Sequence, residues 1–349
     1  MIDFYLIKII FLSTLAFIFT IFWTPLLTNV LYKYKLGKQI RNSGSTPIFS
    51  KLHAHKAGTP TMGGVLMWGT LLVFILFFYF LGKILPIDIF KSLNFLTQKE
   101  TLLPLGALIA SALIGLFDDW LDVRGKGMMG GGGLKMRHRL LIYTAIAIFG
   151  ALWFYFKLDW SMIHIPFLGN FEIGWWYIPI FVTVIVATSF SVNETDGLDG
   201  LAGGTLLVSY IAYGIIAFSM GRYDLAAFCG VLMGALLAFL WFNIAPARFY
   251  MGDTGSMSLG VTLGIIALMT NNIFILPFIG FIFVLESGSV IIQLLSKKFR
   301  HKKVFLSSPI HHHYQAVGWP ETKIVMRFWL VAGVMASIGL MIFLLDKNI

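Results

Sequence analysis

The stretch FSVNETDGLDGLAGG (Phe190 to Gly204) places three acids between two long apolar segments. These acids are Glu194, Asp196 and Asp199. Two further motifs, GLFDDWLDV and MGDTGS, supply Asp118, Asp119 and Asp253. Mg²⁺ typically binds one or two carboxylates together with phosphate oxygens and waters. If the chain brings these acids together, their chemistry suits phosphoryl transfer, in which catalysis is mostly positioning and charge neutralisation.

Two other motifs carry groups that could bind phosphate. KAGTPTMGG holds Lys56 and Thr61, whose ammonium and hydroxyl groups suit a phosphate or a nucleotide base. PIHHHY holds three consecutive histidines, His311, His312 and His313. Three adjacent side chains cannot easily converge on one zinc ion, and no cysteine accompanies them. We therefore favour imidazoles that donate to phosphate oxygens over a zinc site.

Each acidic motif also has a purely structural explanation. Asp118 and Asp119 could be solvated acids where a helix meets water, but a helix C-terminus disfavours anions, which favours a nearby cation or substrate. Asp196 and Asp199 have the spacing of a capping box at a helix N-terminus. Asp253 could equally cap the helix that follows it. These alternatives stay open at this point.

Composition decides the setting of these motifs. The chain is 58% hydrophobic and 12% charged, whereas a soluble domain has about 25% charged residues. Its apolar residues form blocks of the roughly 20 residues that span a bilayer as a helix. We predict an all-α polytopic membrane protein of one domain, 1–349, with ten transmembrane helices. They cover roughly 4–31, 63–82, 101–117, 138–157, 175–192, 201–220, 225–243, 255–271, 273–295 and 324–345.

Charge is distributed unevenly between the two sides of the predicted bundle. Of the 26 Lys and Arg residues, 19 lie in the loops and span ends that follow odd-numbered spans. Positive residues stay in the cytoplasm, so we expect both termini outside and these loops inside. Half of the 16 acids lie in the same loops. We therefore expect a site that faces the cytoplasm, built from loops near 33–62, 118–139, 193–203, 243–256 and 296–323.

Three further features complete this prediction. Topology and contact with anionic lipid explain most of the net charge of +10, so we expect the lipid bilayer and no nucleic acid as partner. IHIPFLGNFEIGWW alternates apolar residues around Gly169-Asn170, which predicts a small extracytoplasmic β-hairpin near 163–176. Glu286 lies within the ninth span, where an acid indicates either a function or a buried partner.

Five motifs resemble, in order, the signatures of the polyprenyl-phosphate N-acetylhexosamine-1-phosphate transferases, and the resemblance covers nearly the whole chain. They are KAGTPTMGG, GLFDDW, NETDGLDGLA, PARFYMGDTGS and SSPIHHHYQAVGWPE. The three histidines favour the muramoyl branch of this family over its N-acetylglucosamine branch. The resemblance implies Mg²⁺-dependent transfer of phospho-N-acetylmuramoyl-pentapeptide from UDP-N-acetylmuramoyl-pentapeptide to undecaprenyl phosphate. It thus implies formation of lipid I and UMP at the bacterial plasma membrane, for peptidoglycan synthesis.

The resemblance also implies roles by motif position. Asp118 would deprotonate the lipid phosphate, beside a second catalytic acid, Asp119. Asp253, also catalytic, and Asp196 would bind Mg²⁺. Expected contacts at the nucleotide and elsewhere in the site are Lys56, Thr61, Asn193, Asp196, Gly197, Leu198, Asp199, Asn243 and Tyr250. Expected contacts to the diphosphate or sugar are Gln293, His311, His312 and His313.

This chain departs from the family pattern at three positions. Asp122 stands where the family usually has Lys, and Lys126 and Arg139 are the basic residues that could replace it as substrate contacts. Tyr250 replaces a phenylalanine but keeps a ring that can stack on uracil. Glu194 replaces an apolar residue, and nothing in the sequence explains it.

Two mechanisms and two other functions stay open. We prefer direct attack of the lipid phosphate on the β-phosphate of the UDP-sugar, with Asp118 as base, over a phospho-enzyme on an aspartate. The same chemistry with UDP-N-acetylglucosamine is the nearest rival function. A transporter is a rival of another class, but transport sites usually lie near the bilayer midplane, whereas these acids crowd one face. The sequence also leaves the oligomeric state open, a homodimer included.

Overall fold

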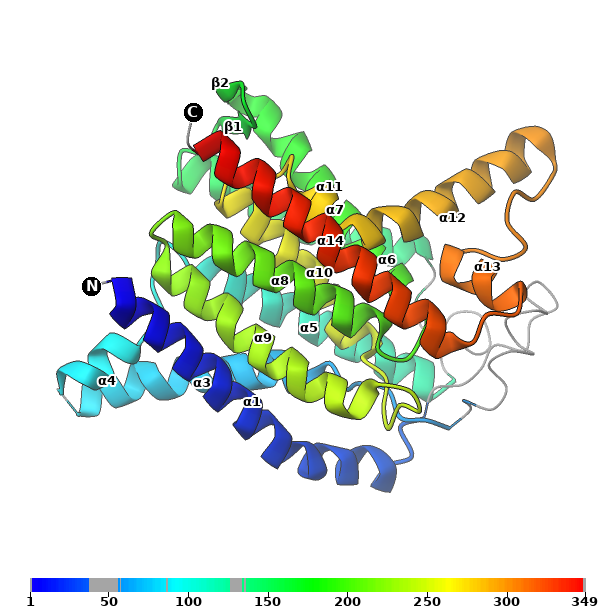
Figure 1. Cartoon of the computed structure of the whole chain (residues 1–349). Coiled ribbons are helices and arrows are strands. Elements are labelled where there is room, and N and C mark those ends of the chain that lie inside the picture. Colours follow the sequence, from blue (N-terminus) through cyan, green and yellow to red (C-terminus); the bar gives the residue numbers. More distant parts are fainter. Residues whose placement is uncertain are drawn as a thin grey trace.

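The computed structural model describes residues 2–37, 56, 58–85, 87–125, 134 and 136–347. The described chain is helical with one small hairpin, as the sequence predicts (Figure 1). The long helices are α1 (Ile2–Lys33), α3 (Val65–Ile84), α5 (Leu102–Val123), α6 (Met136–Lys157), α7 (Tyr177–Thr195), α8 (Leu201–Ser219), α9 (Tyr223–Asn243), α10 (Gly252–Met269), α12 (Phe281–Arg300) and α14 (Glu321–Lys347). The shorter elements are α4 (Asp88–Leu93), β1 (Met162–Ile165), β2 (Gly169–Glu172), η2 (Gly174–Trp176), α11 (Leu276–Ile279) and α13 (Ile310–Ala316).

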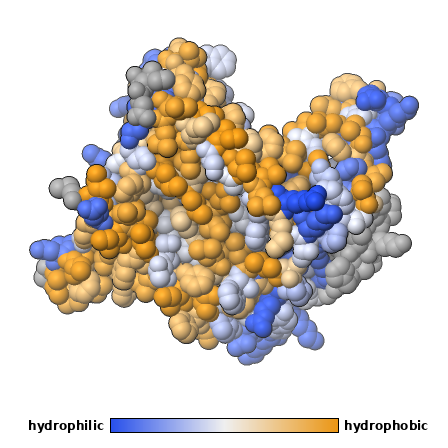
Figure 2. Space-filling model, in the orientation of Figure 1, coloured by the Kyte–Doolittle hydropathy of each residue, from blue (hydrophilic) through white to orange (hydrophobic). Residues whose placement is uncertain are grey.

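The surface of the bundle is mainly apolar, as Figure 2 shows for one face. Bulky side chains such as Phe22 and Leu330 are 77% and 71% exposed. Such a surface is favourable in lipid and unfavourable in water. Within the described residues, nine helices are long and apolar enough to cross a bilayer, namely all the long helices except α12. The prediction of a multi-pass membrane protein is confirmed, with nine candidate spans where the sequence predicts ten.

The predicted ninth span, 273–295, is wrong as one continuous helix. The chain forms the four-residue helix α11, which has Pro277 in its first turn, and restarts after Gly280 as α12. Proline cannot donate a backbone hydrogen bond within a helix, and glycine costs a helix conformational entropy. α12 then extends away from the bundle, and it has three basic residues in its last turn (Figure 1).

The predicted hairpin is confirmed, but its turn lies elsewhere. β1 and β2 pair antiparallel, with Ile165 opposite Gly169. The turn therefore covers 166–168, and Phe167 has a φ of 66° there. Gly169 and Asn170, expected in the turn, belong to β2 instead.

α10 lies in the middle of the bundle and packs against α5 and α7. Every residue of α10 is buried except Asp253. The close approach of α5 requires glycine at position 115, because a Cβ on Gly115 would lie 2.4 Å from the backbone oxygen of Asp253. The core therefore fixes the first turn of α10, and Asp253 is the member of this helix that stays accessible.

Candidate active site

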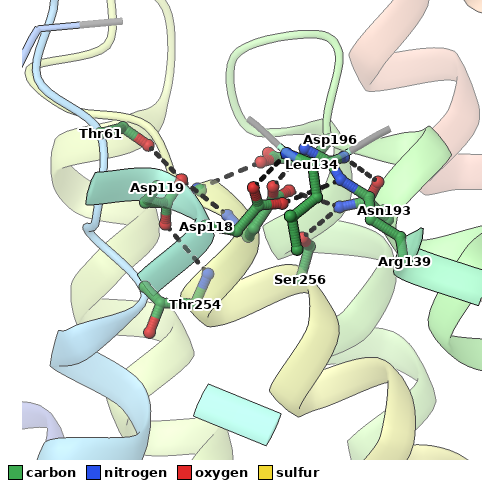
Figure 3. A network of polar contacts seen from close by, with 11 residues as sticks. Thr61, Asp118, Asp119, Leu134, Arg139, Asn193, Asp196, Thr254 and Ser256 are labelled. Atoms are coloured by element: carbon green, nitrogen blue, oxygen red, sulfur yellow. Dashed lines mark hydrogen bonds and ion pairs between the residues drawn. The ribbon is translucent and has the colours of Figure 1, made fainter. Parts of the chain in front are cut away.

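Two acids from different helices meet at Arg139 of α6. Asp118 of α5 is fully buried, and its Oδ2 lies 2.9 Å from Nε of Arg139. The Nη2 atom of the same guanidinium lies 2.6 Å from Oδ2 of Asp253. Asn193 donates from Nδ2 to Oδ1 of Asp253 at 2.6 Å and accepts from Nη1 of Arg139 at 3.1 Å (Figure 3). The predicted convergence of these acids is confirmed, and one cation holds them together.

The neighbouring acid, Asp119, faces the backbone of α10 instead. Its Oδ1 accepts the N–H of Asp253 at 3.0 Å and the hydroxyl of Thr61 at 3.2 Å. Its Oδ2 accepts the N–H of Thr254 at 3.0 Å. A helix N-terminus has N–H groups without helical partners and favours negative charge. Asp119 thus caps α10 from another helix. The alternative in which Asp253 caps α10 is wrong, because Met251 is the N-cap residue and no side chain there forms a cap.

Gly252, the first residue of α10, lies directly against the side chains of this cap. Its φ is 74°, and an added Cβ would lie 2.5 Å from both Oδ2 of Asp119 and Oγ1 of Thr61. We expect Gly252→Ala to lower the free energy of unfolding by at least about 2 kcal/mol, because positive-φ strain and the clash act together. Thermal inactivation in detergent measures this loss. Gly106→Ala is the control, since a Cβ there meets nothing within 4 Å, and equal losses in both variants would contradict the prediction.

The acids of the TDGLDG motif do not cap α8. That helix begins after Gly200, which has a φ of 83° and offers no side chain. Asp196 ends α7, and its Oδ2 accepts the N–H of Gly252 at 3.2 Å. Asn243 accepts the N–H of Gly200 at 2.9 Å and donates to the carbonyl of Phe249 at 2.9 Å. The capping-box alternative is therefore wrong, and Asp196 adds a third carboxylate beside the first turn of α10.

Lys56 lies within a second group of acids. Its Nζ lies 2.6 Å from Oδ1 of Asp199 and 2.5 Å from Oε1 of Glu321. The same Glu321 oxygen accepts the N–H of Asp199 at 2.6 Å, and Oδ2 of Asp199 accepts the N–H of Ala247 at 3.0 Å. The sequence prediction includes Lys56 and Asp199 but not Glu321. The position of Glu321 at the end of the SSPIHHHYQAVGWPE motif is the signal that could have found it.

Tyr250 lies next to this second group. Its backbone donates to the carbonyl of Pro60 and accepts from the N–H of Gly63, each at 2.8 Å. Burial raises the pKa of the Tyr250 phenol to about 12, and the nearby carboxylates of Asp199 and Glu321 add to the rise. The ring is therefore neutral and is fixed beside the KAGTPT motif.

The first histidine of the HHH motif packs on the TDGLDG motif. His311 is fully buried, and its Nδ1 lies 2.9 Å from Oε2 of Glu286. A Cβ added to Gly197 would lie 2.3 Å from Nε2 of His311, so the ring rests directly on Gly197. Burial lowers the pKa of His311 to about 3, and the positive charge of Lys56 adds to the effect. His311 is therefore a neutral imidazole, His312 beside it is buried as well, and Glu286 has a buried partner.

Gln293 of α12 holds the loop that precedes α13. Its Oε1 accepts the N–H groups of Val304 and Phe305, each at 3.0 Å, and its Nε2 donates to the carbonyl of Phe305 at 3.0 Å. His313 accepts the N–H of Leu306 at Nδ1, at 3.2 Å. Both side chains thus hold the backbone of one loop, and their contacts to diphosphate or sugar stay predictions.

Leu198 is buried in a small apolar cluster that includes Ile324 of α14. Lys126 lies outside the described residues. Nothing in the structure explains the departure at Glu194.

Comparison with known proteins agrees with this geometry. Residues 56–66 match phospho-N-acetylmuramoyl-pentapeptide-transferase signature 1, and residues 101–271 match glycosyl transferase family 4. A phospho-N-acetylmuramoyl-pentapeptide-transferase of Chloroflexus aggregans is 38% identical to this chain. The aligned region covers 95% of this chain and 89% of that protein. The chain belongs to the phospho-N-acetylmuramoyl-pentapeptide-transferase family. A member from a Geobacillus species is 37% identical, and the aligned region covers 94% of this chain and 95% of that protein. A member from Bacillus subtilis is 36% identical, and the aligned region covers 96% of this chain and 97% of that protein.

The donor set of this transferase fits Mg²⁺. Asp118, Asp196 and Asp253 present carboxylate oxygens around the start of α10, and Arg139 stands between two of them. Carboxylates this close together favour a cation between them. Within the described part of the chain, no three His, Cys, Asp or Glu side chains could hold a metal ion by themselves. Mg²⁺ commonly takes one or two carboxylates and completes its shell with substrate phosphates and waters.

Proposed function

We propose that this enzyme of the phospho-N-acetylmuramoyl-pentapeptide-transferase family acts with Mg²⁺ on UDP-N-acetylmuramoyl-pentapeptide and undecaprenyl phosphate, and forms lipid I and UMP. The observation that carries the proposal is the contact of Arg139 with both Asp118 and Asp253, at 2.9 and 2.6 Å. These groups lie where α5, α6 and α7 meet the first turn of α10. The charged site on an apolar bundle suits a water-soluble nucleotide donor and a lipid acceptor.

Asp118 is proposed as the general base. Its carboxylate would accept the proton of the lipid phosphate, whose oxygen attacks the β-phosphorus of the donor while UMP leaves. Arg139 contacts both carboxylates and orients them, and Asn193 orients Asp253 from the other side. Mg²⁺ bound by Asp253 and Asp196 would supply charge neutralisation on the diphosphate.

The nucleotide end of the donor is proposed to lie at Lys56, Asp199 and Tyr250. The support for this placement is that an ammonium group, a carboxylate and an aromatic ring lie together there. These groups match the hydrogen-bonding edge and the flat face of a base. The diphosphate and sugar would then lie between this group and Arg139, next to Gly197 and the neutral imidazole of His311.

We further propose that the site faces the cytoplasm of a bacterial plasma membrane and that both termini lie outside. Both ends of the described chain lie at the same end of the bundle, because Lys8 of α1 contacts Asp224 at the start of α9 and Lys347 of α14 contacts Ser219 at the end of α8. α12 therefore returns the chain to the other end, although it is not among the nine candidate spans. The support is the concentration of Lys and Arg, along the sequence, in the loops that follow odd-numbered predicted spans, because the same loops supply Asp118, Asp196 and Asp253.

Mg²⁺-dependent release of UMP tests the proposed function. The purified full-length chain should release UMP from UDP-N-acetylmuramoyl-pentapeptide only when undecaprenyl phosphate and Mg²⁺ are both present. UDP-N-acetylglucosamine is the matched alternative donor and should be turned over far more slowly. Faster turnover of UDP-N-acetylglucosamine would assign the chain to the rival donor. Uptake of a solute into vesicles, with no lipid-linked product, would instead favour a transporter.

The same assay separates direct attack from a phospho-enzyme. Without undecaprenyl phosphate, direct attack forms no labelled protein from a donor that carries ³²P in its β-phosphate. Trapping of labelled phospho-N-acetylmuramoyl-pentapeptide bonded to an aspartate, with release of UMP under these conditions, would overturn direct attack.

A further inference from the structure

Glu321, the first residue of α14, joins segments that are far apart in the sequence. One of its oxygens contacts the ammonium of Lys56 at 2.5 Å and the backbone N–H of Asp199 at 2.6 Å. Asp199 in turn accepts the N–H of Ala247, in the loop that leads to Tyr250. The start of α14 thus contacts both the KAGTPTMGG motif, through Lys56, and the TDGLDG motif, through Asp199.

A local explanation accounts for only part of this arrangement. An acid in the first turn of a helix interacts favourably with the helix dipole, which explains the residue type at position 321. It does not explain why the carboxylate of Glu321 turns inward to partners 265 and 122 positions away in the sequence. The side chains of Lys56, Asp199 and Glu321 are only 11%, 7% and 17% exposed. Charges this well buried need partners, so each of the three constrains the other two.

Removing Glu321 would change the positions of both partners. Asp199 would lose the acceptor of its backbone N–H, at the turn between α7 and α8. Lys56 would keep one of its two carboxylates and gain freedom to rotate. Both effects fall on the proposed nucleotide contacts, whereas Asp118 and Asp253 are held by Arg139 and Asn193.

We propose that Glu321 is a positioning residue for the donor nucleotide, which it serves by holding Lys56 and the backbone of Asp199 in place. It does not touch the reacting atoms. The inference rests on the proposed placement of the nucleotide at Lys56, Asp199 and Tyr250.

Steady-state kinetics of the full-length chain in detergent or nanodiscs test this role. Glu321→Ala should raise KM for the sugar nucleotide by about tenfold or more, because hydrogen bonds to charged groups are lost. The kcat value should change by less than about threefold, and KM for undecaprenyl phosphate should not change. Glu321→Gln should lie between wild type and Glu321→Ala, because it keeps an acceptor for the N–H of Asp199 but loses the charge. Glu172→Ala, an exposed acid in β2, is the matched control and should behave as wild type.

A double-mutant cycle tests whether Glu321 acts through Lys56. If it does, Glu321→Gln should weaken donor binding less in a Lys56→Met background than in wild type. Full additivity, an unchanged KM for the donor, or a loss confined to kcat would each overturn the proposal. If Glu321→Ala fails to fold, the kinetics of Glu321→Gln and the double-mutant cycle still test the positioning role of Glu321. Wild type without any UMP release would instead refute the proposed function, and the inference would fall with it.

Discussion

Asp253→Asn is expected to abolish turnover while the protein stays folded in the membrane. Asparagine keeps an oxygen that can accept from Asn193 but removes the negative charge that faces Arg139 at 2.6 Å and the proposed Mg²⁺. Groups placed to stabilise transition-state charge are worth about 10²–10³-fold in kcat each, and this carboxylate is proposed to serve both Arg139 and the metal. We therefore expect kcat to fall by at least about 1,000-fold. UMP release at saturating substrates and Mg²⁺ measures it.

The control for this variant is Asp88→Asn, which changes a fully exposed acid in α4. It should keep wild-type activity. Gel filtration and thermal inactivation should show that Asp253→Asn is as well folded as the control. Near-normal turnover would show that the proposed role of Asp253 is wrong, and an unfolded variant would show that its role is structural.

Asp119→Ala is expected to destabilise the fold and not merely the reaction. It would leave the partly buried N–H of Asp253, the buried N–H of Thr254 and the buried hydroxyl of Thr61 without their acceptor. Each unsatisfied buried group costs about 1–3 kcal/mol, so we expect a loss of at least about 3 kcal/mol in the free energy of unfolding. The measurement is the temperature at which the purified protein loses its folded state in detergent.

Asp118→Asn is the matched comparison, because it changes the adjacent acid of the same helix. It should lose turnover with a much smaller change in thermal stability, since Arg139 keeps its contact with Asp253. Asp119→Ala that is as stable as wild type but inactive would restore the catalytic role implied by the family resemblance. Equal destabilisation of both variants would contradict the assignment of a structural role to Asp119 and a catalytic role to Asp118.

Convergence of the motifs was predictable because hydrophobic spans and charge fix which loop ends share a face. Asp118, Asp196 and Asp253 come from three such ends, and they do meet. Interpretations based on local sequence spacing were less successful, because contacts with distant segments determine where these side chains lie. Asp196 and Asp199 have capping-box spacing, but Gly200 is the N-cap residue and the acids contact other segments.

Two other differences have separate physical causes. The helix predicted over 273–295 ignored Pro277 and Gly280, because the apolar run around them is long enough to span a bilayer. The partners of Asp119 and Glu321 are backbone N–H groups, which every non-proline residue carries. The residue types in the sequence therefore do not predict these contacts, which depend on how α5 and α14 pack against the rest of the bundle.

The order of the site residues along the chain bears on biosynthesis. Lys56 lies before the second long helix, and its partner Glu321 opens the last one. A ribosome must therefore deliver nearly the entire polypeptide to the translocon before the nucleotide region can assemble. Prematurely terminated products that lack α14 should stay inert in the membrane, and co-expression of α14 as a separate fragment is the way to ask whether they can be rescued.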